Sequence, residues 1–193
     1  MTLRITWLAH GPTSATRQAS FPEDEPIEEK ARKAAARLAD SISRADQVLI
    51  APERRARDTA AALGLSGTSD PLLRDCDHGR WAGRALAELE AEEPQALAAW
   101  LEDPDAAPHG GESVADVIRR IARWLDSPER SRGRILAVTH PTVIRAALIH
   151  ALGAPASSFW RVDVAPLSRL TLSRQGPHWR VQALVTPSHA DTD

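Results

Sequence analysis

The chain contains 193 residues, carries a formal net charge of −2 at pH 7, and is 42% hydrophobic. The balanced charge gives no indication of a nucleic-acid partner or an anionic membrane surface, and no apolar run approaches membrane-spanning length. The single cysteine, Cys76, excludes an internal disulfide and a cysteine-based zinc cluster, and it fits a reducing compartment.

Length and composition together predict one cytoplasmic domain. A chain of this size can bury a sizeable core, and the N-terminus lacks the basic start and apolar stretch of a signal peptide. We expect a single domain over residues 1–187 and a disordered tail over residues 188–193.

The first predicted element is a buried strand that ends at a histidine. An apolar run over residues 3–9 stops at His10-Gly11-Pro12, a sequence typical of a tight loop. The loop continues to Pro26, a length that is usual for functional or mobile loops. A helix over residues 27–42 follows, with apolar residues at helical spacing.

A second strand and helix bring an arginine toward the same region. Residues 47–50 form a short apolar strand, and Ala51-Pro52 starts a helix with proline in its first turn. Arg55 lies near the start of that helix and can turn toward the strand ends. Residues 70–77 then predict a strand or extended segment.

The remaining elements complete an α/β pattern. We predict short helices, a capped helix that begins after Ser113, a strand that ends at His140, and a helix that follows it. Three further strands close the chain, the last two as a hairpin. The pattern predicts a three-layer sandwich, a mostly parallel sheet with helices on both faces. The helices are expected at 84–91, 94–101, 114–125 and 141–152, and the strands at 134–139, 160–165, 168–173 and 179–184.

Two histidines end two of these strands. Ligands of open α/β sheets bind outside the carboxyl ends of parallel strands, so His10 and His140 are expected in one pocket. A histidine accepts a phosphoryl group when its ring is held by a hydrogen bond and cations meet the phosphoryl charge. A lone histidine at a strand end is commonly structural, but its combination with Arg55 favours a pocket with His10 as the nucleophile.

Other residues can supply the rest of this chemistry. Arg55 offers a bidentate fork for phosphate oxygens, and His140 can donate to the same oxygens. The backbone amides of Gly11 and Thr13 are further candidate donors. A departing alkoxide needs a proton, and Asp75 is the candidate acid, with Asp77 behind it. The alternative for Asp75 is a surface or helix-capping carboxylate.

These segments resemble the histidine phosphatase superfamily, the phosphoglycerate-mutase-like branch 1. Residues 9–13 (AHGPT) are similar to the family's Arg-His-Gly-x-Thr, and residues 51–60 (APERRARDTA) resemble Ser-x-x-x-Arg-Ala-x-Gln-Thr-Ala. Residues 73–83 (LRDCDHGRWAG) resemble Leu-x-Glu-x-x-x-Gly-x-Trp-Glu-Gly, while residues 109–113 and 138–140 match the Gly-Gly-Glu-Ser loop and the second catalytic histidine. The resemblance covers most of the chain in family order. It implies a phosphatase that needs no metal or cofactor and hydrolyses a small phosphate ester through a phosphohistidine on His10.

The chain departs from the family pattern at three positions. Ala9 replaces the arginine before the catalytic histidine, Thr16 replaces an asparagine, and the acid is the shorter Asp75. Loss of one preorganised donor typically costs about 10²–10³ in rate. We therefore hypothesise that Arg17, on the same loop, turns into the pocket and supplies the missing guanidinium.

Three readings of the function follow from this pattern. The first is a phosphatase, favoured over a mutase because no long inserted segment would retain the product. The second is a protein that binds a phosphorylated or other anionic ligand without turnover, and the third is a different reaction in the same pocket. The joint presence of His10, Arg55, Asp75 and His140 favours catalysis, since a binding protein does not need the acid.

The other histidines and the tryptophans have simpler readings. The remaining histidines lack the spacing of metal ligands and are expected at the surface or in local hydrogen bonds, with His109 beside the Gly-Gly-Glu-Ser loop. Four tryptophans are expected in the core or the pocket wall, because no basic stripe lies between them: Trp81, Trp100, Trp124 and Trp160. The other four histidines are His78, His150, His178 and His189.

Overall fold

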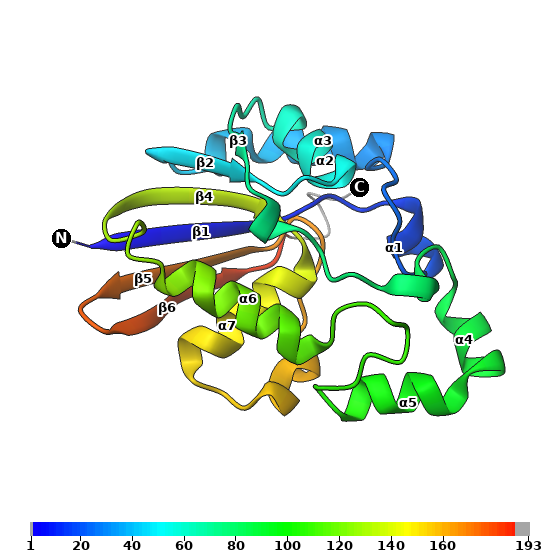
Figure 1. The fold of residues 1–193 in the computed structure, drawn as a ribbon. Helices are drawn as coiled ribbons and strands as arrows, with labels where there is room; N and C mark the ends of the chain where they lie inside the picture. Colours follow the sequence, from blue (N-terminus) through cyan, green and yellow to red (C-terminus); the bar gives the residue numbers. More distant parts are fainter. Residues whose placement is uncertain (1, 188–193) are drawn as a thin grey trace.

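The computed structural model describes residues 2–187, which form a six-stranded mixed sheet (Figure 1). The strand order is β3-β2-β4-β1-β5-β6; β1 to β4 run parallel, and β5 and β6 pair antiparallel at one edge. The tail expected over residues 188–193 lies outside the described residues. The strands are β1 (Leu3–Ala9), β2 (Gln47–Ile50), β3 (Thr68–Ser69), β4 (Gly133–Thr139), β5 (Arg169–Gln175) and β6 (His178–Val185).

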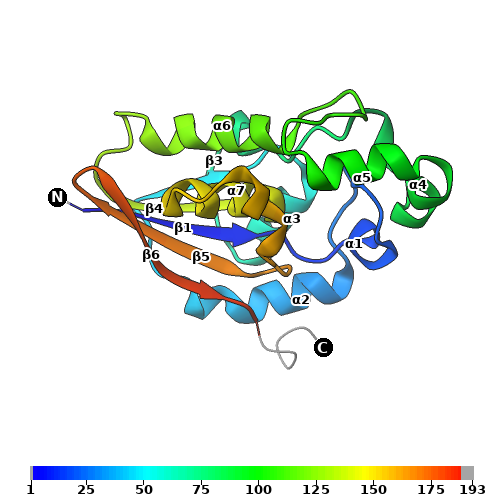
Figure 2. The same cartoon turned by 90° about the horizontal axis from the view of Figure 1, so that it is seen from below.

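Helices cover both faces of this sheet, as the sequence predicts. In Figure 2, α2 and α6 lie on opposite sides of the strands. The fold is therefore an α/β sandwich of three layers. The helices are α1 (Ser14–Gln18), α2 (Glu29–Leu38), α3 (Arg54–Ala62), α4 (Leu86–Glu92), α5 (Pro94–Glu102), α6 (Val114–Asp126) and α7 (Pro141–Leu152), with shorter 3-10 turns η1 (Ala39–Ser41), η2 (Pro71–Leu73), η3 (Gly79–Trp81) and η4 (Ala156–Arg161).

The central strands are buried on both faces, which explains their continuous apolar runs. From Ile135 to Thr139 every residue of β4 is buried, and Leu3, Ile5 and Trp7 of β1 are inaccessible to solvent. In parallel register, Ala9 pairs with Thr139, so both strands end at the same level. The residues that follow these two strands are therefore neighbours.

A second, smaller cluster of buried residues lies beyond the carboxyl end of β1, where α4 and α5 pack (Figure 1). Its aromatic members are Phe21, Trp81 and Trp100, and the rings of His78 and His109 pack against them. The surface position expected for these two histidines is wrong, because aromatic rings cover both of them. His109 does make a local hydrogen bond, accepting from the Gly111 amide at Nδ1 (3.0 Å).

Two predicted strands are absent from the described residues. In the segment 70–77, Pro71 starts the 3-10 turn η2, and the Asp70 carboxylate caps it by accepting from the Leu72 amide (3.0 Å). The segment 160–165 overlaps η4 and then continues as irregular chain. The strand that pairs with β1 begins later, at Arg169. The long loop after β1 contains α1, which the sequence reading omitted.

No helix among residues 2–187 combines the length and the apolar character that crossing a lipid bilayer requires.

Candidate active site

His10 and His140 meet at the carboxyl ends of β1 and β4, as the sequence predicts. Their ring centroids are 5.3 Å apart, and the His10 amide donates to the Thr139 carbonyl (2.9 Å). A cavity of about 250 Å³ opens beside them. Its wall includes His10, Asp75 and His78, together with residues of α1 and α7.

The His10 ring is held as a neutral imidazole with one free nitrogen. Its Nδ1 lies 2.8 Å from the Gly11 carbonyl oxygen, which can only accept, so Nδ1 carries the proton. Burial, followed by the positive charges of His140 and Arg55, lowers the pKa of His10 to about 3. At neutral pH, Nε2 therefore keeps its lone pair, the state that a nucleophilic histidine requires.

Arg55 approaches the site from the first turn of α3, but it is occupied by partners within the protein. Its side chain is almost wholly buried, and one terminal nitrogen donates to the Glu23 carbonyl (2.7 Å) while the other donates to Asp75 Oδ2 (2.7 Å). Its Nε is buried without a hydrogen-bond partner among the residues that the structure describes. The Nε–H of Arg55 is therefore an unused donor. A phosphate would have to compete with Asp75 for the terminal nitrogens of Arg55.

Asp75 is buried at the site and ionised. Burial opposes the charge, but the positive charges of His140 and Arg55 overcome it and hold the pKa of the Asp75 carboxyl well below its usual range. Its Oδ1 also accepts from the Cys76 amide (2.8 Å). The surface alternative for Asp75 is excluded by its burial, and Asp77 instead caps the next turn by accepting from the Gly79 amide (2.9 Å).

Glu53 connects the second histidine to the acid, a contact that the sequence reading missed. Its Oε2 lies 2.7 Å from His140 Nε2, and its Oε1 accepts from the Asp75 amide (3.1 Å). Burial would raise the pKa of Glu53, but the hydrogen bond and charge of His140 lower it. His140 Nδ1 lies 3.4 Å from Asp75 Oδ2 and has no hydrogen-bond partner among residues 2–187. Glu53 thus fixes the ring with Nδ1 directed at Asp75.

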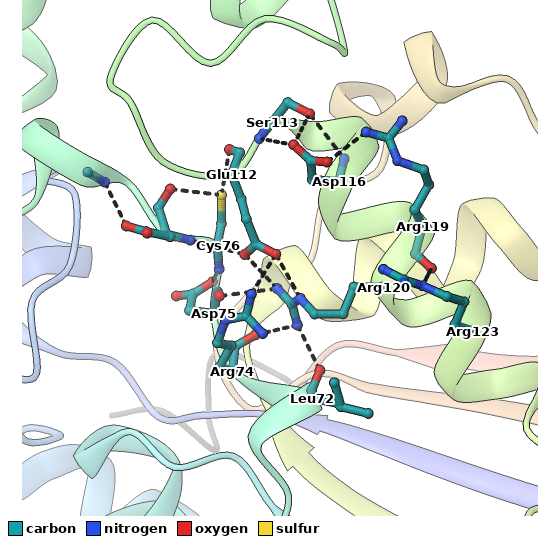
Figure 3. Close-up of polar contacts among 12 residues, drawn as sticks. Leu72, Arg74, Asp75, Cys76, Glu112, Ser113, Asp116, Arg119, Arg120 and Arg123 are labelled. Carbon is teal, nitrogen blue, oxygen red and sulfur yellow. Dashed lines mark hydrogen bonds and ion pairs between the residues drawn. The ribbon is translucent and has the colours of Figure 1, made fainter.

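Arg120 of α6 fixes the backbone that carries Asp75 (Figure 3). The buried guanidinium donates to the carbonyls of Leu72 (2.7 Å), Arg74 (3.0 Å) and Asp75 (3.2 Å). It also forms a bidentate pair with Glu112, with both N–O distances at 2.9 Å. Five hydrogen bonds from one side chain therefore hold the irregular segment after η2 against α6.

The structure does not bring Arg17 to the cavity, which corrects the hypothesis that its guanidinium substitutes for the one missing at Ala9. The Arg17 side chain is 68% exposed, and its guanidinium lies 3.1 Å from Glu28 Oε1. A capping box between Thr13 and Thr16 starts α1, and Arg17 falls on the exposed face of this helix.

The two predicted backbone donors are already engaged. The Gly11 amide donates to Thr59 Oγ1 (2.9 Å), and the Thr13 amide donates to Thr16 Oγ1 (3.4 Å). Thr13 itself lies in the cavity wall. These amides shape the loop after β1, and a ligand would have to displace their partners to reach them.

Arg145 of α7 lines the cavity and was also missed from sequence. Its Nε donates to the Val162 carbonyl (2.8 Å), and burial lowers its pKa, opposed by the charges of Asp163 and Asp75. A signal existed, since Arg145 is the one charged residue in the run from Val143 to Ile149. For Glu53 the sequence offered a weaker signal: the residue lies between the end of β2 and the start of α3.

No group of three or more histidine, cysteine or acidic side chains is arranged to hold a metal ion within residues 2–187.

Comparisons with known proteins identify the family of the chain. A family model for the histidine phosphatase superfamily (branch 1) matches residues 5–187. A glucosyl-3-phosphoglycerate phosphatase from Mycolicibacterium vanbaalenii is 32% identical over 173 residues, which cover 81% of this chain and 77% of that protein. Phosphoserine phosphatase 1 from Hydrogenobacter thermophilus is 29% identical over 146 residues, 71% of this chain and 69% of that one.

Some mycobacterial relatives are much longer than this chain. A bifunctional protein from Mycobacterium tuberculosis is 36% identical over 129 residues, which are 63% of this chain and 35% of that protein. The match therefore spans about a third of that relative's length. Among solved structures, a mycobacterial glucosyl-3-phosphoglycerate phosphatase has a TM-score of 0.79 and 28% identity, and the match covers 94% of this chain and 98% of that one.

Proposed function

Because the chain belongs to branch 1 of the histidine phosphatase superfamily, we propose that it hydrolyses a small phosphorylated metabolite through a phosphohistidine on His10. The observation that carries this proposal is the state of His10, whose Nδ1 is held by a backbone carbonyl while Nε2 keeps its lone pair. Support also comes from its relatives, which include phosphatases named for phosphoserine and for glucosyl-3-phosphoglycerate.

In the first step, His10 Nε2 attacks phosphorus and the P–O bond to the alcohol breaks. The departing alkoxide takes a proton from Asp75, which must first gain one. An incoming phosphate competes for the Arg55 fork that now neutralises Asp75 (2.7 Å), and its own negative charge disfavours the ionised carboxylate. Substrate binding therefore raises the proton affinity of Asp75, and the proton comes from solvent.

In the second step, Asp75 is again a carboxylate and accepts a proton from water. The resulting hydroxide attacks the phosphohistidine, the N–P bond breaks, and inorganic phosphate leaves with His10 restored. Arg55 and His140 stabilise the phosphoryl charge in both steps. Nε2 of His140 faces Glu53 (2.7 Å), so Nδ1 is the nitrogen on the Asp75 side of the ring.

One observation favours a second candidate, a protein that binds a phosphorylated ligand without turnover. Ala9 supplies no guanidinium to the site. The guanidinium of Arg55 is already paired with the Asp75 carboxylate. If the ligand leaves this pair intact, Asp75 stays ionised and cannot protonate a leaving group. The site would then hold a phosphate ester without cleaving it.

Phosphate release separates these two candidates. We expect the wild-type chain to release inorganic phosphate from members of a panel of small phosphate esters, with a chelator present. His10→Ala should abolish release, while a control variant, His150→Ala, should retain it because His150 pairs with Asp126 away from the cavity. Release that persists in His10→Ala would contradict the proposed mechanism. Ligand-dependent melting without release would favour the binding protein.

A further inference from the structure

The cavity beside His10 contains one arginine or lysine among its described wall residues, Arg145. Arg55, the other arginine of the site, lies behind Asp75 and forms no part of this wall. We propose that Arg145 binds a carboxylate of the substrate, next to the phosphate ester, and so selects phosphorylated carboxylic acids. This inference rests on the proposed phosphatase function and deepens it.

Arg145 is fixed in place before any ligand binds. Its side chain is 19% exposed, and Nε donates to the Val162 carbonyl (2.8 Å). The guanidinium carbon lies 5.5 Å from the Trp160 ring centroid and 5.9 Å from that of Phe159. A guanidinium held by packing and one hydrogen bond loses little entropy when it binds an anion.

The charge of Arg145 is poorly neutralised within the chain. Asp163 Oδ1 lies 3.8 Å from a terminal nitrogen, but the Asp163 side chain is 99% exposed, so solvent screens this pair. Burial lowers the pKa of Arg145, and the charges of Asp163 and Asp75 oppose this effect. A bound anion would supply the missing charge and accept from the terminal nitrogens.

Arg145 and Arg55 approach the site from different elements of the fold. It comes from α7 and packs against the segment 159–163, and Val164 and Pro166 of the same stretch continue the cavity wall. Arg55 comes from α3, lies outside the cavity wall and contacts Asp75 and Glu23. A phosphate on His10 therefore leaves Arg145 to the remainder of the substrate.

Charge and size favour a carboxylate over a second phosphate. One guanidinium edge matches one carboxylate in bidentate geometry. The carboxylates of Glu25 and Asp75 share the cavity wall, so a second dianion would lack compensating cations. The volume of about 250 Å³ suits a small phosphorylated acid.

The test uses pairs of esters that differ by the carboxylate. O-phosphoserine is compared with phosphoethanolamine, and 3-phosphoglycerate with glycerol phosphate, using the full chain. We expect the wild type to prefer the acid of each pair by about tenfold or more in kcat/KM, as for a hydrogen bond to a charged group. Arg145→Met should remove that preference, mainly by raising KM for the acids. Arg145→Lys should restore part of it, and Arg161→Met, at an exposed neighbour, should leave it unchanged.

Two kinetic results would overturn the inference. Equal kcat/KM for both members of each pair in the wild type would exclude a carboxylate site. If Arg145→Met lowers kcat/KM for all four esters by one factor, Arg145 acts on the phosphoryl group instead. If no ester is hydrolysed, the proposed function fails, and calorimetric binding of the same four esters decides. Tighter binding of the acids that is lost in Arg145→Met would support the site, and equal binding would contradict it.

Discussion

Glu53 shows how a single carboxylate organises two other side chains. It accepts at 2.7 Å from His140 and at 3.1 Å from the Asp75 amide, so the second histidine and the acid share one support. Because a carboxylate oxygen only accepts, Nε2 of His140 must carry the proton in this contact. The other ring nitrogen, Nδ1, lies 3.4 Å from Asp75 Oδ2, so the ring of His140 is placed between two carboxylates.

Substitution of Glu53 should therefore impair turnover according to the group that remains. Glu53→Ala leaves the buried Nε2–H of His140 without an acceptor, and we expect kcat to fall about 10²-fold, as for loss of one preorganised contact at a transition state. Glu53→Gln keeps a hydrogen-bond acceptor but not the charge, so its kcat should lie between that of Glu53→Ala and that of the wild type. Nitrogen-15 NMR of His140 reports whether Nε2 keeps its proton. Wild-type kcat in Glu53→Ala, equal to that of the exposed control Glu102→Ala, would show that Glu53 has no such role.

The depressed pKa of His10 predicts how stability depends on pH. The folded chain binds a proton at His10 only near pH 3, whereas the unfolded chain does so near pH 6.5. The unfolded state thus binds more protons between these values, so stability falls as pH is lowered through that window. Between pH 7 and pH 5 the contribution of His10 to this loss is about 2 kcal/mol.

Chemical denaturation at pH 7 and pH 5 measures this effect. His10→Gln should lose less stability over the interval than the wild type, because glutamine does not titrate. His178→Gln, at an exposed histidine, should behave as the wild type. An unchanged pH dependence in His10→Gln would mean that the pKa of His10 is the same in the folded and unfolded chains.

At the scale of elements, the acid is placed by a cluster of polar contacts and not by a strand. The chain from Leu72 to Asp75 has no sheet partner, and Arg120 of α6 donates to three of its carbonyls while pairing with Glu112 (Figure 3). The sequence predicted a strand or extended segment here. It could not show that Pro71 and the Asp70 cap would turn the chain early.

Arg120→Lys tests whether Arg120 positions Asp75 as the proton donor. Lysine keeps the charge but cannot reach three carbonyls and both Glu112 oxygens together. We expect kcat for an alkyl phosphate, which needs a proton from Asp75, to fall about tenfold or more. Turnover of 4-nitrophenyl phosphate should change little, because its leaving group departs without protonation.

The control for this comparison is Arg123→Lys, at an exposed arginine one turn along α6. Equal losses for both substrates in Arg120→Lys would show a general structural role. A larger change, Arg120→Leu, leaves the Glu112 carboxylate with Arg74 (2.9 Å), whose side chain is partly exposed, as its remaining partner. It should lower the free energy of unfolding by about 3 kcal/mol, the low end for a broken buried pair.

At the scale of the whole molecule, the sequence predicted the family, the three-layer fold and the meeting of His10 with His140. These features follow from apolar periodicity and from short motifs at the ends of strands, both of which are local. Glu53, Arg120 and Arg145 were missed because their roles depend on contacts across 87, 45 and 17 residues of sequence, which no local pattern encodes. Arg17 was misplaced for the same reason, since its partner Glu28 is supplied by the following segment.

The family resemblance also left the substrate open, and the fold alone does not determine it. Arg145 in the cavity wall is a feature that distinguishes possible substrates. Position 9, before the catalytic histidine, is alanine and supplies no guanidinium to the site. Catalysis therefore depends on whether His10 is phosphorylated by an ester despite this loss.

The most direct measurement is to trap that intermediate. The wild-type chain is mixed with a labelled phosphate ester, quenched with strong denaturant at alkaline pH, where phosphohistidine survives, and digested for mass spectrometry. We predict phosphate on the peptide that contains His10, lost on brief acid treatment and absent from His10→Ala. Turnover of the ester without any phosphorylated His10 would contradict the account.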